Sequence, residues 1–397
     1  MMPLVSLGLF AAAGIGLVLL SIQLVSVRRH LREPALRPSR WPGISILKPL
    51  CGHDDDLEDN IEQFAMLDYP TYEVVLGVKD RSDAAYPIAI AAQERWPGRV
   101  RVVLQRGEPG MNPKVNQLVT LARAARHDVL VVSDSNVQVE IDYLSEIAAY
   151  FEDANVGLVT HAVVGVGEAR LGSLMDNLHM GGSVGAGMIG AKRVVRKDLV
   201  VGKSMALRRA DLRALGGFEV VADVLAEDYV LGKMVSSELG KRVAMAHRPV
   251  HNVSRHRSTR DFLRRYQRWG VIHRQAVGPY VYASGMILNP LVVGLAAFAF
   301  CPSGTSLAAL GACSAAKIAY DGVAVQSLRG GRIPWRTLVA SPIKDLLLAV
   351  AWMHGFLNRQ VEWRQNHLRV LPGTRLERPL AFIPRPASAA DCDEIAA

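Results

Sequence analysis

The chain has 397 residues, enough for one large domain with additions or for two domains. Half of its residues are hydrophobic and its mean hydropathy is +0.16, which is high for a soluble enzyme. The formal net charge of +9 favours an anionic partner, either nucleic acid or a membrane surface. Long apolar segments favour the membrane, so we expect no nucleic-acid partner. The cysteines show neither metal-ligand spacing nor a disulfide framework, which is typical of a reducing compartment; they are Cys51, Cys301, Cys313 and Cys392.

The first apolar segment lies near the amino terminus. Residues 5–27 are almost free of charge and are long enough to cross a hydrocarbon core of ~30 Å. Basic residues follow this segment directly at 28–32, whereas a cleaved signal peptide carries them before its apolar run. The order predicts a signal-anchor transmembrane helix within residues 1–32, with its carboxyl side in the cytoplasm.

Residues 33–275 alternate between apolar runs and segments with helical spacing, after a proline-bearing linker. We predict strands at 44–50, 72–78, 100–105, 129–133, 156–164, 201–207 and 242–246. We predict a polar loop at 110–116 and helices at 54–67, 84–95, 117–125, 141–151, 209–215, 226–239 and 259–275. This alternation predicts a cytoplasmic α/β domain with a Rossmann-like, mostly parallel sheet. Residues 165–200, which are rich in Gly and Met, support no assignment.

The chain becomes strongly apolar again after residue 275. The run at 281–300 could span a membrane, whereas the runs at 306–324 and 338–357 each contain ionisable residues, which are costly in a span. Each of these two runs could span the membrane, enter and leave it on one side, or lie at its surface. We therefore predict a C-terminal membrane domain of one to three spans at 276–360. A basic segment follows at 361–397, and its Pro- and Ala-rich tail after Leu380 is predicted to be disordered.

One strand ends in a candidate binding residue. The buried-type run at 129–133 stops at Asp134, with Ser135 and Asn136 after it. In open α/β sheets, ligands bind in the crevice at the carboxyl ends of the strands. A carboxylate there can hold a divalent cation against a diphosphate. It can equally cap the following turn, and the residues alone leave both interpretations open.

Two further acids and a basic helix complete the set of candidates. Asp80 follows the strand at 72–78, and Asp228 starts a helix, where the dipole favours an acidic pair with no further role. Arg265 and Arg268 share one face of the predicted helix at 259–275, which could instead grip anionic lipid as an interfacial helix. Four histidines have no ligand spacing to Asp134, so we expect structural or surface roles for them: His161, His247, His251 and His256.

The ordered set of motifs resembles the inverting GT-A glycosyltransferases, which use nucleotide-diphosphate sugars and act at membranes. Among these it is most similar to the ceramide glucosyltransferase family. The resemblance covers nearly the whole chain, from the signal anchor to Trp363-Arg364. The motifs that carry it are Ile46-Leu-Lys48-Pro49-Leu50, Leu67-Asp68-Tyr69-Pro70, Val78-Lys-Asp80, Asn112-Pro-Lys114-Val-Asn116, Asp134-Ser135, Ala226-Glu227-Asp228 and Arg265-x-x-Arg268-Trp269.

The resemblance implies a role for each motif. Asp80 would bond the uracil or ribose, and Asp134 would hold Mg²⁺ or Mn²⁺ against the diphosphate. Asp228 would act as general base on the acceptor hydroxyl. The remaining candidates are Lys48 and Lys114 for the nucleotide or its phosphates, Arg265 and Arg268 for the diphosphate, and Trp269 for stacking near the acceptor entrance.

One departure from the family concerns the metal. Many relatives have a second carboxylate at the position of Asn136. Coordination would therefore use the single carboxylate of Asp134, with water or another ligand completing the shell.

The resemblance implies a multi-pass enzyme of the inner membrane. It would transfer a hexose, glucose from UDP-glucose, to the primary hydroxyl of ceramide or a similar lipid, inverting an α-linked donor to a β-glycoside. Three alternatives stay open: transfer of N-acetylglucosamine or another sugar to a hopanoid or diacylglycerol, processive polysaccharide synthesis, and a non-catalytic membrane scaffold. One to three C-terminal spans are few for a polysaccharide channel, and the three aspartates argue against a scaffold. The oligomeric state stays open.

Overall fold

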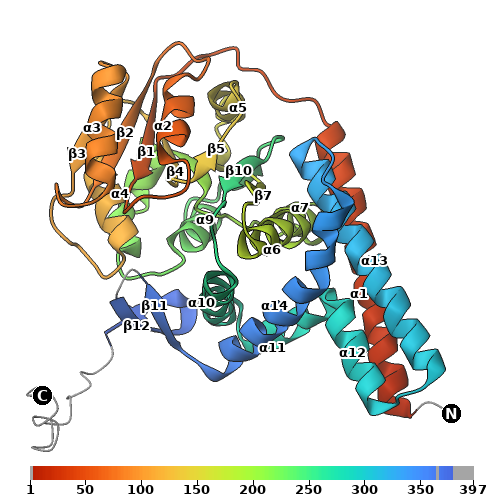
Figure 1. The fold of residues 1–397 in the computed structure, drawn as a ribbon. Helices are drawn as coiled ribbons and strands as arrows, with labels where there is room; N and C mark the ends of the chain where they lie inside the picture. Colours follow the sequence, from red (N-terminus) through yellow and green to blue (C-terminus); the bar gives the residue numbers. More distant parts are fainter. Residues whose placement is uncertain (1–2, 364–365, 379–397) are drawn as a thin grey trace, which may run out of the picture.

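A seven-stranded sheet forms the centre of the fold in a computed structural model that describes residues 3–363 and 366–378 (Figure 1). Its strand order is β3-β2-β1-β4-β8-β6-β9, and β8 alone runs antiparallel to its neighbours. The predicted mostly parallel α/β sheet is confirmed. The strands are β1 (Ile44–Pro49), β2 (Tyr72–Val78), β3 (Val100–Leu104), β4 (Val129–Ser133), β6 (Val156–Thr160), β8 (Ser204–Arg208) and β9 (Arg242–Met245).

Helices cover both faces of this sheet, which explains why its strands are continuous apolar runs. Alternate side chains of β4 enter different clusters: Val131 packs with Phe64 on one face, and Val132 packs with Leu118 on the other. The first face carries α2 (Leu57–Ala65), α3 (Ala85–Arg95) and α5 (Tyr143–Tyr150). The second carries α4 (Pro113–Ala124), α8 (Arg209–Ala214), η3 (Phe218–Val221) and α9 (Glu227–Ser237).

The single strand that we predicted at 156–164 is wrong, because the chain changes sheets at its middle. β6 ends at Thr160, and β7 (Val163–Val166) pairs instead with β10 (Val250–Val253). β10 also pairs with β5 (Val137–Gln138), which begins three residues after Asp134. This second sheet, of order β5-β10-β7, therefore brings the chain after β10 beside the end of β4.

Most of the unassigned stretch at 165–200 forms consecutive helical segments, from Leu171 to Val195. Glycine is required there by close packing, since a β-carbon at Gly172 would lie 2.2 Å from the carbonyl oxygen of Ser258. Two of the segments are π-helical, a geometry that is frequent at functional sites. They are α6 (Leu171–His179), η1 (Met180–Gly185), α7 (Ala186–Gly190) and η2 (Ala191–Val195).

The predicted helix at 259–275 is α10 (Thr259–Val277), which packs against α14 (Ala340–Leu357). After α14 the chain forms a small antiparallel sheet that returns to the central domain. Its elements are β11 (Gln360–Trp363), β12 (Asn366–Val370), η6 (Pro372–Thr374) and β13 (Leu376–Glu377). The tail after Leu380 lies outside the described residues.

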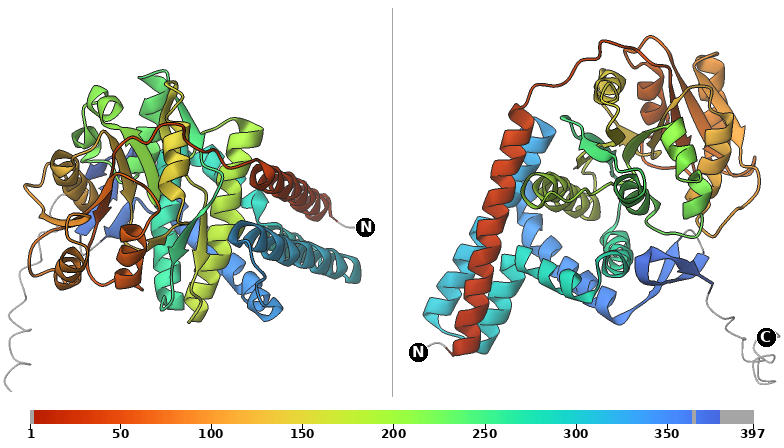
Figure 2. Two further views of the ribbon diagram at one scale, coloured as in Figure 1. Left: turned by 90° about the horizontal axis from the view of Figure 1, so that it is seen from above. Right: turned by 180° about the vertical axis from the view of Figure 1, so that it is seen from behind.

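The apolar segments form an elongated arm beside the sheet domain (Figures 1 and 2). α1, α12 and α13 pack along one another in this arm. Its elements are α1 (Leu4–Arg32), α12 (Pro290–Phe300) and α13 (Gly304–Arg329). α11 (Pro279–Ser284) and η4 (Gly285–Leu288) connect α10 to α12, and η5 (Trp335–Val339) connects α13 to α14.

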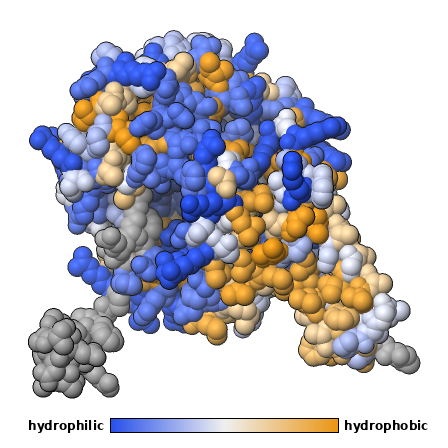
Figure 3. Space-filling view, viewed as in Figure 1, coloured by the Kyte–Doolittle hydropathy of each residue, from blue (hydrophilic) through white to orange (hydrophobic). Residues whose placement is uncertain are grey.

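Within residues 3–363 and 366–378, α1 is the one helix long and apolar enough to cross a membrane. The run predicted at 281–300 is not one straight helix: the segments Pro279–Leu288 and Pro290–Phe300 meet at an angle of 87°. Asn289 caps the second segment and Pro290 begins it, which ends the first helix there. Hydrophobic side chains gather on the surface of the arm, whereas the sheet domain is mostly hydrophilic (Figure 3).

Candidate active site

Asp134 lies directly after β4, between two lysines from other parts of the chain. Its Oδ1 atom is 2.9 Å from Lys114 Nζ, and its Oδ2 atom is 3.0 Å from Lys203 Nζ. Burial tends to raise the pKa of Asp134, but the two ammonium groups outweigh it and hold the pKa well below its usual range. Asp134 is therefore a carboxylate at neutral pH, with charge-assisted hydrogen bonds at both oxygens.

Lys114 connects this carboxylate to the acidic pair at the start of α9. Its Nζ atom lies 2.9 Å from Glu227 Oε1 as well as beside Asp134. Asn112 places the lysine, because its side chain caps α4 by accepting from the backbone N–H of Lys114 at 3.0 Å and its amide lies 3.3 Å from Glu227 Oε2. The Asn112-Pro-Lys114 motif thus orients one helix terminus toward two carboxylates.

Asp228 is held by backbone N–H groups. Its Oδ1 atom accepts from the N–H of Tyr229 at 2.7 Å, and its Oδ2 atom accepts from the N–H of Gly202. A β-carbon at position 202 would lie 2.6 Å from Lys114 Nζ, so a larger residue there would displace this ammonium group. Burial and the neighbouring Glu227 raise the pKa of Asp228 to about 6, although Lys114 opposes the shift. A carboxyl with this pKa suits a general base near neutral pH.

Lys48 is fully buried beneath the site. Its ammonium group donates to the carbonyl oxygen of Asp134 at 2.8 Å and lies 3.7 Å from the ring centroid of Phe64. Burial lowers the pKa of Lys48 to about 7, although Asp134 raises it. The side chain thus fixes the end of β4 from below.

Asp80 lies at the same edge of the sheet, because β2 pairs in parallel with β1 and β1 with β4. It is exposed in the loop after β2, outside the ion-paired cluster around Asp134. Its Oδ1 atom accepts hydrogen bonds from the N–H and hydroxyl groups of Ser82, which lower its pKa.

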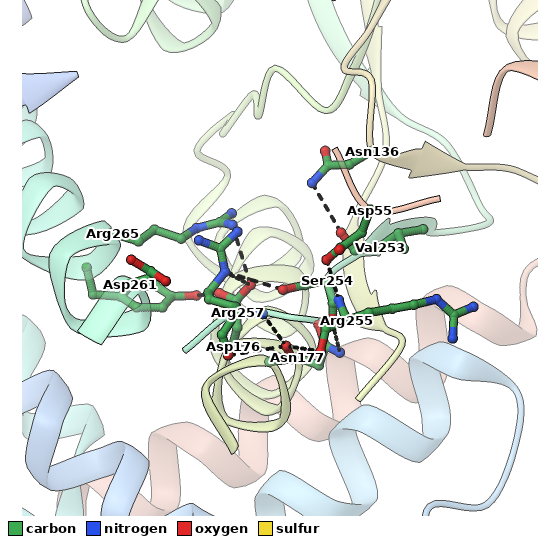
Figure 4. A network of polar contacts seen from close by, with 12 residues as sticks. Asp55, Asn136, Asp176, Asn177, Val253, Ser254, Arg255, Arg257, Asp261 and Arg265 are labelled. Carbon is green, nitrogen blue, oxygen red and sulfur yellow. Dashed lines mark hydrogen bonds and ion pairs between the residues drawn. The ribbon is translucent and has the colours of Figure 1, made fainter. Parts of the chain in front are cut away.

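Arg265 projects from α10 into a buried network (Figure 4). Its Nη1 atom lies 3.4 Å from Asp176 Oδ2, and its guanidinium lies 4.9 Å from the ring centroid of Trp269. Arg257 Nε lies 3.2 Å from the same carboxylate oxygen, and the Tyr266 hydroxyl donates to Asp176 Oδ1 at 2.7 Å. Asp176 therefore holds two arginines in place at the base of the site.

A cleft of about 510 Å³ lies along the same helix, between α10, α14 and β11. Its lining is strongly basic and includes Arg257, Arg264, Arg265 and Arg268. The cleft also contacts β11, so the small C-terminal sheet forms one of its walls. Such a concentration of guanidinium groups is suited to phosphate oxygens.

The loop after β1 encloses the site from the other side. Asp54 accepts a hydrogen bond from the Ser135 hydroxyl, beside Asp134. Asp55 accepts from the backbone N–H of Arg255 at 2.7 Å and from that of His256 at 3.1 Å. These bonds tie the loop to the segment between β10 and α10.

Sequence reasoning missed three site residues: Lys203, Asp176 and Asp54. Lys203 precedes β8 and Asp176 lies in the unassigned helical stretch, so neither stands in a local motif. The only local signal for Asp54 was the run of acids at 54–56. Each meets its partner only after folding brings distant segments together.

Asp134 and Asn136 offer limited coordination for a divalent cation. The described residues contain no group of three His, Cys, Asp or Glu side chains that could hold a metal. Asn136 Oδ1 lies 2.7 Å from Lys203 Nζ, so both donors share the same lysine. Mg²⁺ commonly binds through one or two carboxylates together with substrate phosphates. These residues therefore fit a cation that arrives with a diphosphate.

His161 is buried in the central domain, with Nδ1 2.8 Å from the Ser204 hydroxyl. His247 Nδ1 lies 3.1 Å from the carbonyl oxygen of His30 in α1. His251 lies in β10, and His256 pairs with Asp55 at 2.9 Å. None of these contacts involves Asp134.

The fold is of the GT-A class. It resembles the mannosyltransferase PcManGT from Pyrobaculum calidifontis, solved in complex with GDP-Man and Mn²⁺, with a TM-score of 0.55 and 21% identity over 88% of this chain and 98% of that one. The chain belongs to Glycosyl transferase family 21, whose family model matches residues 8–376. The predicted GT-A class and the resemblance to ceramide glucosyltransferases are thereby confirmed.

Curated relatives agree with this membership. Ceramide glucosyltransferase 3 of Caenorhabditis elegans is 27% identical over 66% of this chain and 56% of its own length. Ceramide glucosyltransferase 1 of the same organism is 27% identical over 63% of this chain and 53% of its own length. The chain thus spans about half the length of these relatives.

Proposed function

We propose that this protein transfers a hexose, glucose from UDP-glucose, to the primary hydroxyl of ceramide or a similar membrane lipid. The family and its ceramide glucosyltransferase relatives support this class of acceptor. The observation that carries the proposal is the position of Lys114, which joins Asp134 to Glu227 beside Asp228. Asp134, which we expect to bind the donor, thereby lies in the same cluster as Asp228, which we expect to act as the base.

Asp134, Arg265, Arg268 and Asp80 would bind the donor. Mg²⁺ or Mn²⁺ held by Asp134, with Asn136 nearby, would supply positive charge that stabilises the departing diphosphate. The arginines of α10 add charge and direction to the phosphate oxygens. Asp80, exposed at the end of β2, is free of the buried cluster and can bond the nucleoside. Lys203 would orient the Asp134 carboxylate, and the buried Lys48 would hold the backbone carbonyl of Asp134 beneath the nucleotide.

Asp228 would take the proton from the lipid hydroxyl. Its carboxylate is fixed by two backbone N–H groups, so a free lone pair keeps a defined direction. The oxygen attacks the anomeric carbon as the bond to the diphosphate breaks, and the proton passes to the Asp228 carboxylate. One displacement inverts the configuration, so an α-linked donor gives a β-glycoside. Trp269, whose ring packs on Arg265, would lie near the acceptor.

The arm formed by α1, α12 and α13 would hold the enzyme in the inner membrane, as a multi-pass protein with its sheet domain in the cytoplasm. Large hydrophobic side chains are exposed along α1, including Ile15 and Val18, and on α12 at Phe300. The basic residues at the end of α1 favour the cytoplasmic side. A lipid acceptor stays in the bilayer, so an anchored catalytic domain can meet it there.

A product assay tests the proposal. Membranes containing the protein are incubated with labelled UDP-glucose, UDP-N-acetylglucosamine, ceramide, diacylglycerol and hopanoid, with Mg²⁺ present. We expect β-glucosylceramide, identified by mass spectrometry and by cleavage with a β-specific glucosidase. A polymer would indicate a processive synthase, and a glycosylated hopanoid or diacylglycerol would change the acceptor. No transfer and no donor hydrolysis would indicate a scaffold.

A further inference from the structure

A pocket of about 370 Å³ lies where α10 and α14 meet the short segments α11 and η4. Aromatic and apolar side chains form most of its walls: Tyr266, Trp269, Tyr282, Met286, Leu348 and Trp352. The Tyr282 and Trp352 rings stack with centroids 5.8 Å apart, which makes one wall flat. Apolar walls with a few convergent polar groups are typical of ligand sites.

The opposite end of the pocket is polar but has no excess charge. Lys317 Nζ lies 2.6 Å from Asp321 Oδ1, and Lys344 Nζ lies 2.7 Å from Asp321 Oδ2 and 3.0 Å from Asp345 Oδ1. The positive charges of the two lysines therefore balance the negative charges of the two aspartates. Such ionisable residues in an apolar helical region are functional candidates, because burying them is costly. Lys317 and Asp345 both line the pocket.

His179 provides a polar atom with no use elsewhere in the described part of the chain. It lines the pocket, and its Nδ1 atom is buried with no hydrogen-bond partner among the described residues. Its ring packs edge-to-face on Tyr266 at 4.6 Å, which fixes its orientation. Since buried polar atoms are nearly always hydrogen-bonded, this nitrogen is available to a polar group of a ligand.

One helix connects the pocket to the charged site. Tyr266 and Trp269 of α10 line the pocket, while Arg265 of the same helix pairs with Asp176. Exposed hydrophobic residues adjoin the pocket. Leu288 lines it and is 38% exposed, and Met353 and Leu357 are exposed on the adjoining α14.

We propose that this pocket binds the acceptor lipid, an inference that rests on the proposed function. The amide or hydroxyl near the lipid head bonds His179, and one hydrocarbon chain runs past Tyr282 and Met286 toward the apolar surface. The balanced charge of the polar end favours a neutral lipid alcohol over an anionic phospholipid. Selection of the acceptor therefore takes place on α10, one helical turn from Arg265.

A matched pair of substitutions tests the pocket. Met286→Trp fills it, whereas Met353→Trp makes the same change at an exposed position of α14 that does not line it. For Met286→Trp we expect the KM for a short-chain ceramide to rise about tenfold or more, with the KM for UDP-glucose and the rate of UDP-glucose hydrolysis unchanged. Met353→Trp should leave all three values near wild type.

A labelling experiment on the wild-type protein is independent of how Met286→Trp folds. A ceramide with a diazirine in its acyl chain should label the peptides that carry Tyr282, Met286 or Trp352. Unlabelled ceramide should compete with this labelling, and phosphatidylglycerol should not. In His179→Leu, preference for ceramide over its N-methylated amide should fall about tenfold.

The outcomes separate the two proposals. Transfer by the wild type with equal ceramide KM values in both Trp variants, or labelling only at exposed positions, would overturn the pocket and leave the proposed function intact. Absence of transfer to any lipid by the wild type would overturn the proposed function itself.

Discussion

Lys114 places its ammonium group 2.9 Å from the carboxylate of Asp134, and both side chains are largely buried. The lysine comes from the start of α4 and the aspartate from the end of β4, so their pairing joins two elements at the carboxyl edge of the sheet. The same ammonium group reaches Glu227 on α9. One cation thus contacts two of the three carboxylates that the site gathers, and Lys203 adds a second cation beside Asp134.

Removing this cation should destabilise the protein strongly. In Lys114→Met the carboxylates of Asp134 and Glu227 lose a buried partner, and breaking a buried pair from one side typically costs about 3–5 kcal/mol. We expect a clear fall in the unfolding midpoint of detergent-solubilised protein. Lys79→Met is the control, since Lys79 pairs with Glu108 at 2.9 Å on the surface and should contribute less than about 1 kcal/mol. Equal midpoints for the two variants would contradict this role.

The pH dependence of transfer should report Asp228. Its pKa is raised to about 6, chiefly by burial and then by Glu227, and only the carboxylate accepts a proton. Transfer should therefore fall about tenfold per pH unit below that pKa and level off above it. Glu227→Gln removes a neighbouring negative charge and should lower the pKa of Asp228. The pH range in which transfer falls should therefore move to lower pH. Asp228→Asn should reduce transfer about 10²–10⁴-fold at every pH while UDP still binds. Wild-type turnover in that variant would exclude Asp228 as the base.

Removing the metal should show whether a divalent cation or the two lysines neutralise the diphosphate of the donor. If Asp134 holds Mg²⁺ or Mn²⁺ with the diphosphate, EDTA should abolish transfer and weaken UDP binding about tenfold or more, as measured by calorimetry. Asp134→Asn should lose that metal-dependent gain in UDP affinity. UDP binding that is equal with and without metal would instead assign the neutralising role to Lys114 and Lys203, which already contact Asp134.

Local pattern was sufficient for most strands of the central sheet, although it joined β6 and β7 into one strand. The run before Asp134 predicted β4 correctly because burial on both faces requires consecutive apolar residues. Asp80 and Asp228 likewise follow from element ends, where a change from apolar to acidic residues is visible in the sequence. The seven-stranded order still required the folded chain, since β8 inserts antiparallel between β4 and β6.

Contacts between distant segments were not predictable in the same way. Asp176 lies in a glycine-rich stretch, and its function is evident only when α6 brings it to Arg265. The π-helical turns after α6 depend on tight packing against other elements rather than on helix propensity. The bend at Asn289 was visible as an Asn-Pro pair, but the apolar composition on both sides obscured it.

The C-terminal sheet should position the base, although it lies far along the chain from Asp228. The backbone N–H of Leu225 donates to the carbonyl oxygen of Thr374 at 2.9 Å, and that of Leu376 donates to the carbonyl oxygen of Asp223 at 2.7 Å. Thr374 is fully buried, so this segment is fixed against the loop that leads into Glu227-Asp228. Without this C-terminal segment, the start of α9 should be able to shift.

Truncation after Leu371 tests this positioning role. Since a small misplacement of a catalytic group is costly, we expect kcat to fall about tenfold or more with the affinity for UDP within about twofold of wild type. Truncation after Arg378 retains every bond just described and should keep wild-type kcat. The readout that distinguishes positioning from general destabilisation is the pH profile: a displaced Asp228 loses the environment that raises its pKa, so the falling limb moves to lower pH. A truncated enzyme with unchanged kcat and an unchanged profile would show that the loop keeps its conformation without the C-terminal sheet.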